Sequence, residues 1–247
     1  MSPRTHPRTV LMLGSAPMAA RAALWPRAPF DAVLAINNAH AIRPDWTHHI
    51  HPFDFPPTRV PTPREGQTIV TEADFVPAQN ALGGFVYAGA TMAFTAAYWA
   101  LHALRPRTIA AFGCDMHYPA TGPTHFYGTG TPDPLRPDIT LRSLEAKSAR
   151  LMVLAAMRGC AMVNLSTGPS RLVFPRTDRG HVGQVRPMTF HEPLAAEALA
   201  EEARLNYRTP SGFYRDASPL NAAALDAIDA LWLATIAPAR VRRLSHR

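Results

Sequence analysis

The stretch TIAAFGCDMHYPATGPTHFY, residues 108–127, joins a short apolar run to a polar segment. The apolar run 109–112 is typical of a fully buried strand, and it ends at Gly113. The polar segment contains an acid, two histidines and two tyrosines, namely Asp115, His117, Tyr118, His125 and Tyr127. Ligands of open α/β sheets bind outside the carboxyl ends of the strands, so these side chains are candidate functional groups. Any one of them alone would fit a loop that is merely polar, but the five together favour a site.

Segments with strand and helix character alternate on both sides of this stretch. Strands are expected at residues 9–13, 30–36, 45–51, 67–71, 109–112 and 161–165, with a further short apolar run at 172–174. Helices are expected at residues 18–24, 72–82, 91–104 and 141–158, with Thr91 near the N-cap of the third. This alternation predicts an α/β fold with a mostly parallel, doubly wound (Rossmann-like) sheet within residues 1–175.

The pattern changes after Pro175. Helices are expected at 194–206 and 220–236, followed by a basic tail, so residues 176–247 form a C-terminal helical extension. The extension could be a lid, a dimerisation element that makes a homo-oligomer, or a membrane-facing surface. Its apolar residues could equally pack against the core.

The composition describes a globular protein. The chain has 247 residues, of which 47% are hydrophobic and 17% charged. No apolar run approaches the roughly 20 residues that a membrane span needs, and we expect a cytoplasmic protein. Cys114 and Cys160 have no partner at metal-ligand spacing, and we expect both to be reduced thiols.

The net charge of +7 and the pI of about 10.1 raise the question of nucleic-acid binding. Lys147 is the only lysine, and the arginines are dispersed rather than gathered in one stripe, so no nucleic-acid partner is expected. The exception is the C-terminal group Arg240, Arg242, Arg243 and Arg247. This group predicts peripheral contact with the anionic inner face of a membrane, or attraction of an anionic substrate.

Two further strand ends carry candidate ligand-binding groups. The first strand turns through Gly14, Ser15, Ala16 and Pro17 into a helix, a geometry that can offer backbone N–H groups to a phosphate. The turn lacks both G-x-G-x-x-G and G-x-x-x-x-G-K-[ST], and its glycine also has a purely steric explanation. The second strand ends in Asn37 and Asn38, which could bind a ribose, a base or a phosphate, or form an Asx-turn.

Three histidines, His48, His49 and His51, fall within the expected third strand. Alternation along that strand would place Trp46, His48 and Ile50 on one face, and Thr47, His49 and His51 on the other. They lack the i, i+4 spacing and the nearby carboxylate that a metal site would favour. We therefore expect one of them to contact a substrate and none to hold a metal.

Several of these segments together resemble a known family. They are LGSAPM (13–18), INN (36–38), GAT (89–91), GCDMHY (113–118) and NLSTGPSRL (164–172). Their order and spacing are similar to those of bacterial lipooligosaccharide sialyltransferases and motility-accessory glycosyltransferases. More distantly, the first turn resembles that of archaeal 6-hydroxymethylpterin diphosphokinases. The resemblance covers residues 9–172.

The resemblance implies a role for each matching residue. Residues 14–17 would lie at the nucleotide phosphate and Asn37 at the sugar nucleotide, while His51 falls where the family has an Asn. Thr91 matches a small hydroxyl residue, Asp115 the acid of G-x-D, and His117 or Tyr118 a phosphate-contacting tyrosine. Two departures concern the chemistry: the family's histidine base falls near Thr129, past His125, and the arginine that the family has ahead of the central helix has no counterpart here.

The chemistry of glycosyl transfer needs a base for the acceptor hydroxyl and stabilisation of the leaving phosphate. We expect His125, or else His117, as the base and Tyr118 with Tyr127 at the phosphate. The chain contains no D-x-D motif, so no metal and no other cofactor are expected. The residues predict a metal-independent transferase, and the resemblance implies that it moves a CMP-activated, sialic-acid-like sugar to a surface glycan or glycolipid. The alternatives are a diphosphokinase-like or a non-catalytic protein that binds a nucleotide or a pterin.

Overall fold

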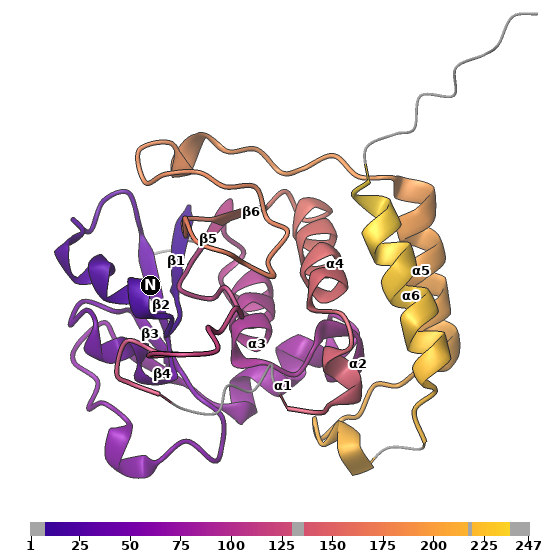
Figure 1. Ribbon diagram of the computed structural model, residues 1–247, viewed down its shortest axis with the longest axis horizontal. Coiled ribbons are helices and arrows are strands. Elements are labelled where there is room, and N and C mark those ends of the chain that lie inside the picture. Colours follow the sequence, from indigo (N-terminus) through magenta and orange to yellow (C-terminus); the bar gives the residue numbers. More distant parts are fainter. Residues whose placement is uncertain (1–7, 130–135, 217–218, 238–247) are drawn as a thin grey trace, which may run out of the picture.

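The protein contains one sheet of six parallel strands in the order β4-β3-β2-β1-β5-β6, as seen in a computed structural model that describes residues 8–129, 136–216 and 219–237. The strands are β1 (Thr9–Leu13), β2 (Ala32–Ile36), β3 (His48–Ile50), β4 (Thr68–Val70), β5 (Thr108–Phe112) and β6 (Ala161–Asn164). The α-helices are α1 (Glu72–Asn80), α2 (Phe85–Ala88), α3 (Met92–Trp99), α4 (Leu144–Ala156), α5 (Glu192–Leu205) and α6 (Ala222–Thr235). The expected parallel α/β fold is thus confirmed (Figure 1).

The strand order places a topological switch point between β1 and β5. The chain moves outward from β1 to β4 and then returns to pair β5 on the other side of β1. Leu13 pairs with Phe112, so both strands end at the same level of the sheet. A crevice at such a point is where open α/β sheets bind ligands.

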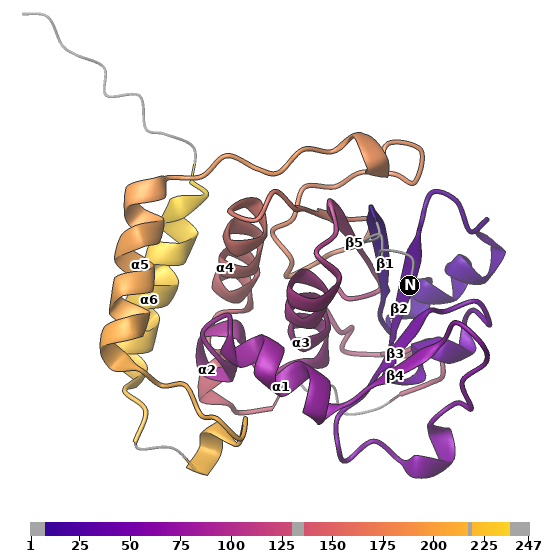
Figure 2. The ribbon, with the colours of Figure 1, turned by 180° about the vertical axis from the view of Figure 1, so that it is seen from behind.

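Both faces of the sheet are covered, which explains why its strands are apolar without alternation. In β1, Val10 and Met12 point into the larger hydrophobic cluster, whereas Leu11 and Leu13 point into the smaller one. The helices α1, α3 and α4 cover the larger face, and the short α2 packs against these helices (Figures 1 and 2). The smaller face is covered by the 3₁₀ helices Pro17–Leu24 and Asn37–Ala41 and by residues around Val182.

Some local expectations need correction. The segment after β1 is a 3₁₀ helix (Pro17–Leu24) rather than a regular helix. Trp46 does not share a face with His48 and Ile50, because it precedes the short β3 and packs in the smaller cluster. The short apolar run 172–174 lies outside the strands. Thr91 does begin the central helix, since its hydroxyl accepts a hydrogen bond from the N–H of Phe94 at 3.2 Å.

The C-terminal helices α5 and α6 pack as a pair against α4, on the side away from the sheet (Figures 1 and 2). Their residues Ala195, Leu225, Ile228 and Trp232 belong to the same hydrophobic cluster as the larger sheet face. Leu231 and Ile236 are partly buried against this cluster, whereas Leu233 is more exposed. The basic group Arg240 to Arg247 lies outside the described residues. No helix of the described chain has the length and apolar character to cross a membrane.

Buried ion pairs attach these helices to α4. Arg150 donates to both carboxylate oxygens of Glu202 at 2.6 Å, and Lys147 donates to Asp229 at 2.7 Å. Burial raises the pKa of Asp229 and lowers that of Lys147, and the attraction between the two groups opposes both shifts. The only lysine of the chain therefore has a structural position.

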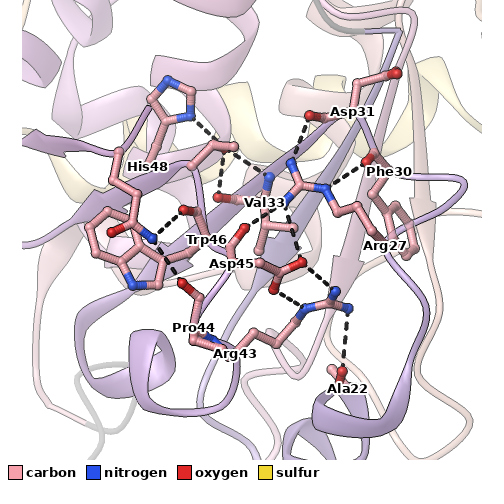
Figure 3. A network of polar contacts seen from close by, with 12 residues as sticks. Ala22, Arg27, Phe30, Asp31, Val33, Arg43, Pro44, Asp45, Trp46 and His48 are labelled. Atoms are coloured by element: carbon pink, nitrogen blue, oxygen red, sulfur yellow. Dashed lines mark hydrogen bonds and ion pairs between the residues drawn. The ribbon is translucent and has the colours of Figure 1, made fainter. Parts of the chain in front are cut away.

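A polar network lies at the amino-terminal ends of β2 and β3 (Figure 3). Arg43 binds both carboxylate oxygens of Asp45 at 2.8 Å, and Arg27 donates to the carbonyls of Phe30 and Asp31. Thr47 exchanges hydrogen bonds of 3.0 Å with the backbone of Val33. The hydrogen bonds from Arg43 lower the pKa of Asp45. This network sets the start of the strands, whereas ligands are expected at their ends.

Candidate functional site

A cavity of about 520 Å³ opens at the switch point, at the carboxyl ends of β1, β2 and β5. Nine of the residues predicted for the site contribute to its wall: Gly14, Ser15, Ala16, Asn37, Thr91, His117, Tyr118, His125 and Tyr127. Four do not: Pro17, Asn38, His51 and Asp115. Segments that are far apart in the sequence therefore meet around one cavity.

Two glycines let the ends of β1 and β5 approach each other closely. A Cβ atom on Gly14 would lie 2.3 Å from the carbonyl oxygen of Gly113 and 2.7 Å from Sγ of Cys114. Gly113 has a φ of +71°, and a Cβ atom on it would lie 2.6 Å from Cβ of Ala19. Both positions need glycine on steric grounds. This close approach also forms the bottom of the cavity, since Gly14, Gly113 and Cys114 all line it.

The first turn offers less to a phosphate than its sequence suggests. The N–H of Gly14 donates to the carbonyl of Phe112 at 2.9 Å, and that of Ala16 donates to Gly113 at 3.0 Å. These two groups hold the β1 and β5 turns together and are not available to a ligand. The carbonyl of Ser15 accepts from the N–H of Phe126 at 2.9 Å, which brings the His125 segment over the turn.

Asn37 follows β2 and adopts the left-handed conformation, with a φ of 51°. Its side chain lines the cavity, and its Oδ1 is buried without a hydrogen-bond partner among the described residues. A buried carboxamide oxygen without a partner is unfavourable, and a ligand with an N–H or O–H donor would satisfy it. Asn38 does not line the cavity, and Nδ1 of His51 donates to the carbonyl of Pro52 at 2.9 Å.

The GCDMHY segment divides its side chains between the cavity and the protein interior. Met116, His117 and Tyr118 line the cavity. Asp115 is buried instead, and its Oδ1 accepts from Nδ2 of Asn164 at 3.0 Å. The backbone carbonyl of Asp115 accepts from the N–H of Arg171 at 2.9 Å, so this acid supports the loop after β6.

His125 stands in the cavity wall between two tyrosines. Its ring stacks on that of Tyr127 at 4.9 Å and lies 6.0 Å from that of Tyr118. This segment is a tight turn and not extended, since His125 and Gly128 exchange backbone hydrogen bonds. The two rings nevertheless lie on one side.

The surroundings of His125 suit a base. Burial lowers its pKa below the ordinary 6.5, so the ring is neutral at pH 7. Its Nδ1 lies 2.9 Å from Oγ1 of Thr124. When Nδ1–H donates to that hydroxyl oxygen, Nε2 carries the lone pair that a general base needs. His117 also lines the cavity but is exposed.

Arg59 is a cavity residue that the sequence interpretation missed. It ends the short 3₁₀ helix Pro57–Arg59 in the proline-rich segment that follows β3. The carbonyl of Arg59 accepts from Nε2 of His40 at 2.9 Å, which ties this segment to the 3₁₀ helix after β2. No motif marks Arg59 in the sequence, because only the folding of an irregular loop over the strand ends brings it to the cavity.

The described wall of the cavity has a positive character. Arg59 is its only formally charged side chain, and no carboxylate belongs to it. Serine, threonine, asparagine, histidine and tyrosine supply further polar groups. Within the described residues, no three His, Cys, Asp or Glu side chains are grouped so that they could hold a metal ion. The wall therefore favours an anionic ligand with several hydrogen-bonding groups.

No family model matches the chain, and neither the curated proteins nor the solved structures contain a significant match. A functional conclusion therefore depends on the cavity itself and on the sequence motifs around it.

Proposed function

We propose that the protein is a metal-independent glycosyltransferase whose donor is a CMP-activated, sialic-acid-like sugar. The observation that carries the proposal is the neutral His125 in the wall of a switch-point cavity that also contains Arg59, Tyr118 and Tyr127. The resemblance of five sequence motifs to bacterial sialyltransferases supports the same assignment. A volume of about 520 Å³ falls within the range of roughly 300–1,000 Å³ that is usual for small-molecule sites.

The residues of the wall suggest the following division of work. Arg59 and the hydroxyls of Ser15 and Tyr118 bind the phosphate of the donor, and Asn37 binds a hydroxyl or amino group of the nucleotide sugar. Nε2 of His125 removes the proton of the acceptor hydroxyl while the oxygen of that hydroxyl forms a bond to the anomeric carbon of the donor sugar. The bond from that carbon to the phosphate oxygen breaks, and CMP leaves with both electrons of the bond. Arg59 and Tyr118 stabilise the charge of the departing phosphate.

The acceptor would be a surface glycan or glycolipid. Transfer to a glycolipid would place the protein in the cytoplasm at the inner membrane face, where the basic C-terminal residues could touch anionic lipid. A diphosphokinase-like activity is the alternative. It is disfavoured because it needs converging carboxylates for a magnesium nucleotide: no carboxylate belongs to the described wall, and the candidate acid Asp115 lies outside it and accepts a hydrogen bond from Asn164.

A thermal-shift experiment tests the proposal. CMP at 100 times its dissociation constant stabilises the fold by about 2.7 kcal/mol. For a chain of this size this corresponds to roughly 5–10 °C in Tm, and the shift should persist in EDTA. Arg59→Gln should reduce it, whereas Arg64→Gln, on the same loop but outside the cavity, should not. Stabilisation by ATP with magnesium and not by CMP would favour the kinase, and no response to any nucleotide would refute nucleotide binding.

A further inference from the structure

The backbone of Asn37 is held by a buried histidine that does not touch the cavity. Nε2 of His49, in β3, lies 2.8 Å from the carbonyl oxygen of Asn37. His49 is fully buried and does not line the cavity. The contact connects two neighbouring strands at their carboxyl ends, since Ala35 pairs with His49 just before Asn37 begins its turn.

The protonation of His49 follows from its surroundings. A carbonyl oxygen can only accept a hydrogen bond, so Nε2 must carry the hydrogen. Burial lowers the pKa of His49 to about 4, and the ring is therefore neutral at pH 7, with its lone pair on Nδ1. Nδ1 is buried and has no partner among the described residues. The hydrogen bond from Nε2–H to the carbonyl of Asn37 is therefore the only one that this ring makes to the described residues. The ring makes it only in the tautomer with the hydrogen on Nε2.

Packing leaves the ring little freedom to turn away. Four aromatic rings surround it: His40 at 4.9 Å, His51 at 5.2 Å, Phe55 at 5.8 Å and Trp46 at 6.0 Å between ring centroids. Because the His49 ring is fixed in this way, its Nε2–H holds the carbonyl oxygen of Asn37 in one position. The acceptor belongs to a residue whose left-handed backbone is unfavourable for most side chains, although asparagine tolerates it better than most.

We propose that His49 is a positioning residue, which holds the left-handed backbone of Asn37 so that its carboxamide faces the ligand in the cavity. The ligand part of this inference rests on the proposed nucleotide-sugar function. Asn37 is the residue that meets the ligand, and His49 acts through it. The orientation matters because Asn37 lines the cavity and its buried Oδ1 has no partner among the described residues. Without the His49 hydrogen bond, Asn37 can relax to a right-handed conformation that carries its side chain away from the cavity.

Replacing His49 by Gln and by Met separates this role from simple packing. The two side chains have similar length and shape, but only Gln has an N–H that can reach the carbonyl of Asn37. We expect His49→Met to weaken CMP binding about three- to tenfold in isothermal titration calorimetry, the effect of one hydrogen bond. His49→Gln should bind within about twofold of the wild type. His48→Phe is the matched control, because His48 is the neighbouring, partly buried histidine of β3 and contacts Trp99 and Thr47 instead of Asn37.

A crystal structure of each variant gives a measurement that needs no ligand. In His49→Met the φ of Asn37 should leave the left-handed region, and in His49→Gln it should remain there. If His49→Met does not fold, His49→Phe keeps a ring in the same space without the donor and should give the same result. Unchanged CMP affinity with an unchanged φ of Asn37 in the Met or Phe variant would overturn the inference. If the wild type binds no nucleotide but φ still changes, His49 does position Asn37 and it is the proposed function that fails.

Discussion

Replacing Arg150 by Met should destabilise the protein by about 3–5 kcal/mol, the usual effect of leaving one charge of a buried pair alone. The side chains of Arg150 and Glu202 are 1% and 5% exposed. Arg150 donates to both oxygens of Glu202, to the hydroxyl of Tyr98 at 2.6 Å and to the carbonyl of Leu82 at 2.7 Å. After the substitution, Glu202 would keep the hydrogen bond from Nε1 of Trp232, 2.8 Å away, and its second oxygen would lose its donors.

Urea unfolding at pH 7, followed by far-UV circular dichroism and tryptophan fluorescence, measures this effect. The double variant Arg150→Met/Glu202→Leu should recover most of the loss, because it removes both charges and leaves only neutral groups to be satisfied: the hydroxyl of Tyr98, the carbonyl of Leu82 and the N–H of Trp232. Arg204→Met is the matched control. Arg204 also binds a glutamate of α5, Glu201, but this pair is exposed, so the unfolding midpoint should hardly change. A loss below about 1 kcal/mol in Arg150→Met, or a double variant as unstable as the sum of the single ones, would refute the reasoning.

Two further predictions concern acid stability and the base. Burial alone would raise the pKa of Asp138, but hydrogen bonds from Tyr214, Thr140 and Arg215 lower it to about 2. Asp138 therefore contributes its full stabilisation to the folded state above its unfolded pKa of about 4, and this contribution is lost as the pH falls toward 2. After allowance for solvent screening, the free energy of unfolding should fall by about 1 kcal/mol over this range. Asp138→Asn should abolish this part of the acid dependence in urea titrations between pH 5 and 2, and an unchanged dependence would contradict it. For the base, His125→Ala should lower kcat by about 10²- to 10⁴-fold and remove the acidic limb of the pH–rate profile, which lies below pH 6.5 because burial lowers the pKa. The CMP affinity of this variant should change little. A near-normal kcat with the acidic limb intact would show that His125 is not the base, and His117 would then be the candidate.

The sequence predicted the parts of the fold that depend on local patterns. The apolar runs of β1 and β5 and the cap at Thr91 were correct because burial on both faces and a helix start leave local signals. Trp46 was placed on the wrong face because the expected strand began too early, and alternation holds only within a strand.

The candidate site was predictable only as a set of strand ends. Because the strands are parallel and β1 lies between β2 and β5, the segments after these three strands meet at the carboxyl-terminal end of the sheet. Nine predicted residues line the cavity there. The direction of each side chain was not predictable. Asp115 turns toward Asn164, and Arg59 reaches the cavity from an irregular loop. Both depend on long-range contacts that no local pattern encodes.

Backbone strain provides a separate argument for the location of the site. Four non-glycine residues among those described have a positive φ: Asn37, Arg105, Met116 and Asn206. Arg105 and Asn206 end helical segments, where a left-handed residue is a common C-cap and needs no functional explanation. Asn37 and Met116 end no helix, and both line the cavity. Methionine has no polar side chain to stabilise this conformation locally, so its surroundings must impose it. Such strain is characteristic of functional sites, and here it occurs on both sides of the switch point, after β2 and after β5.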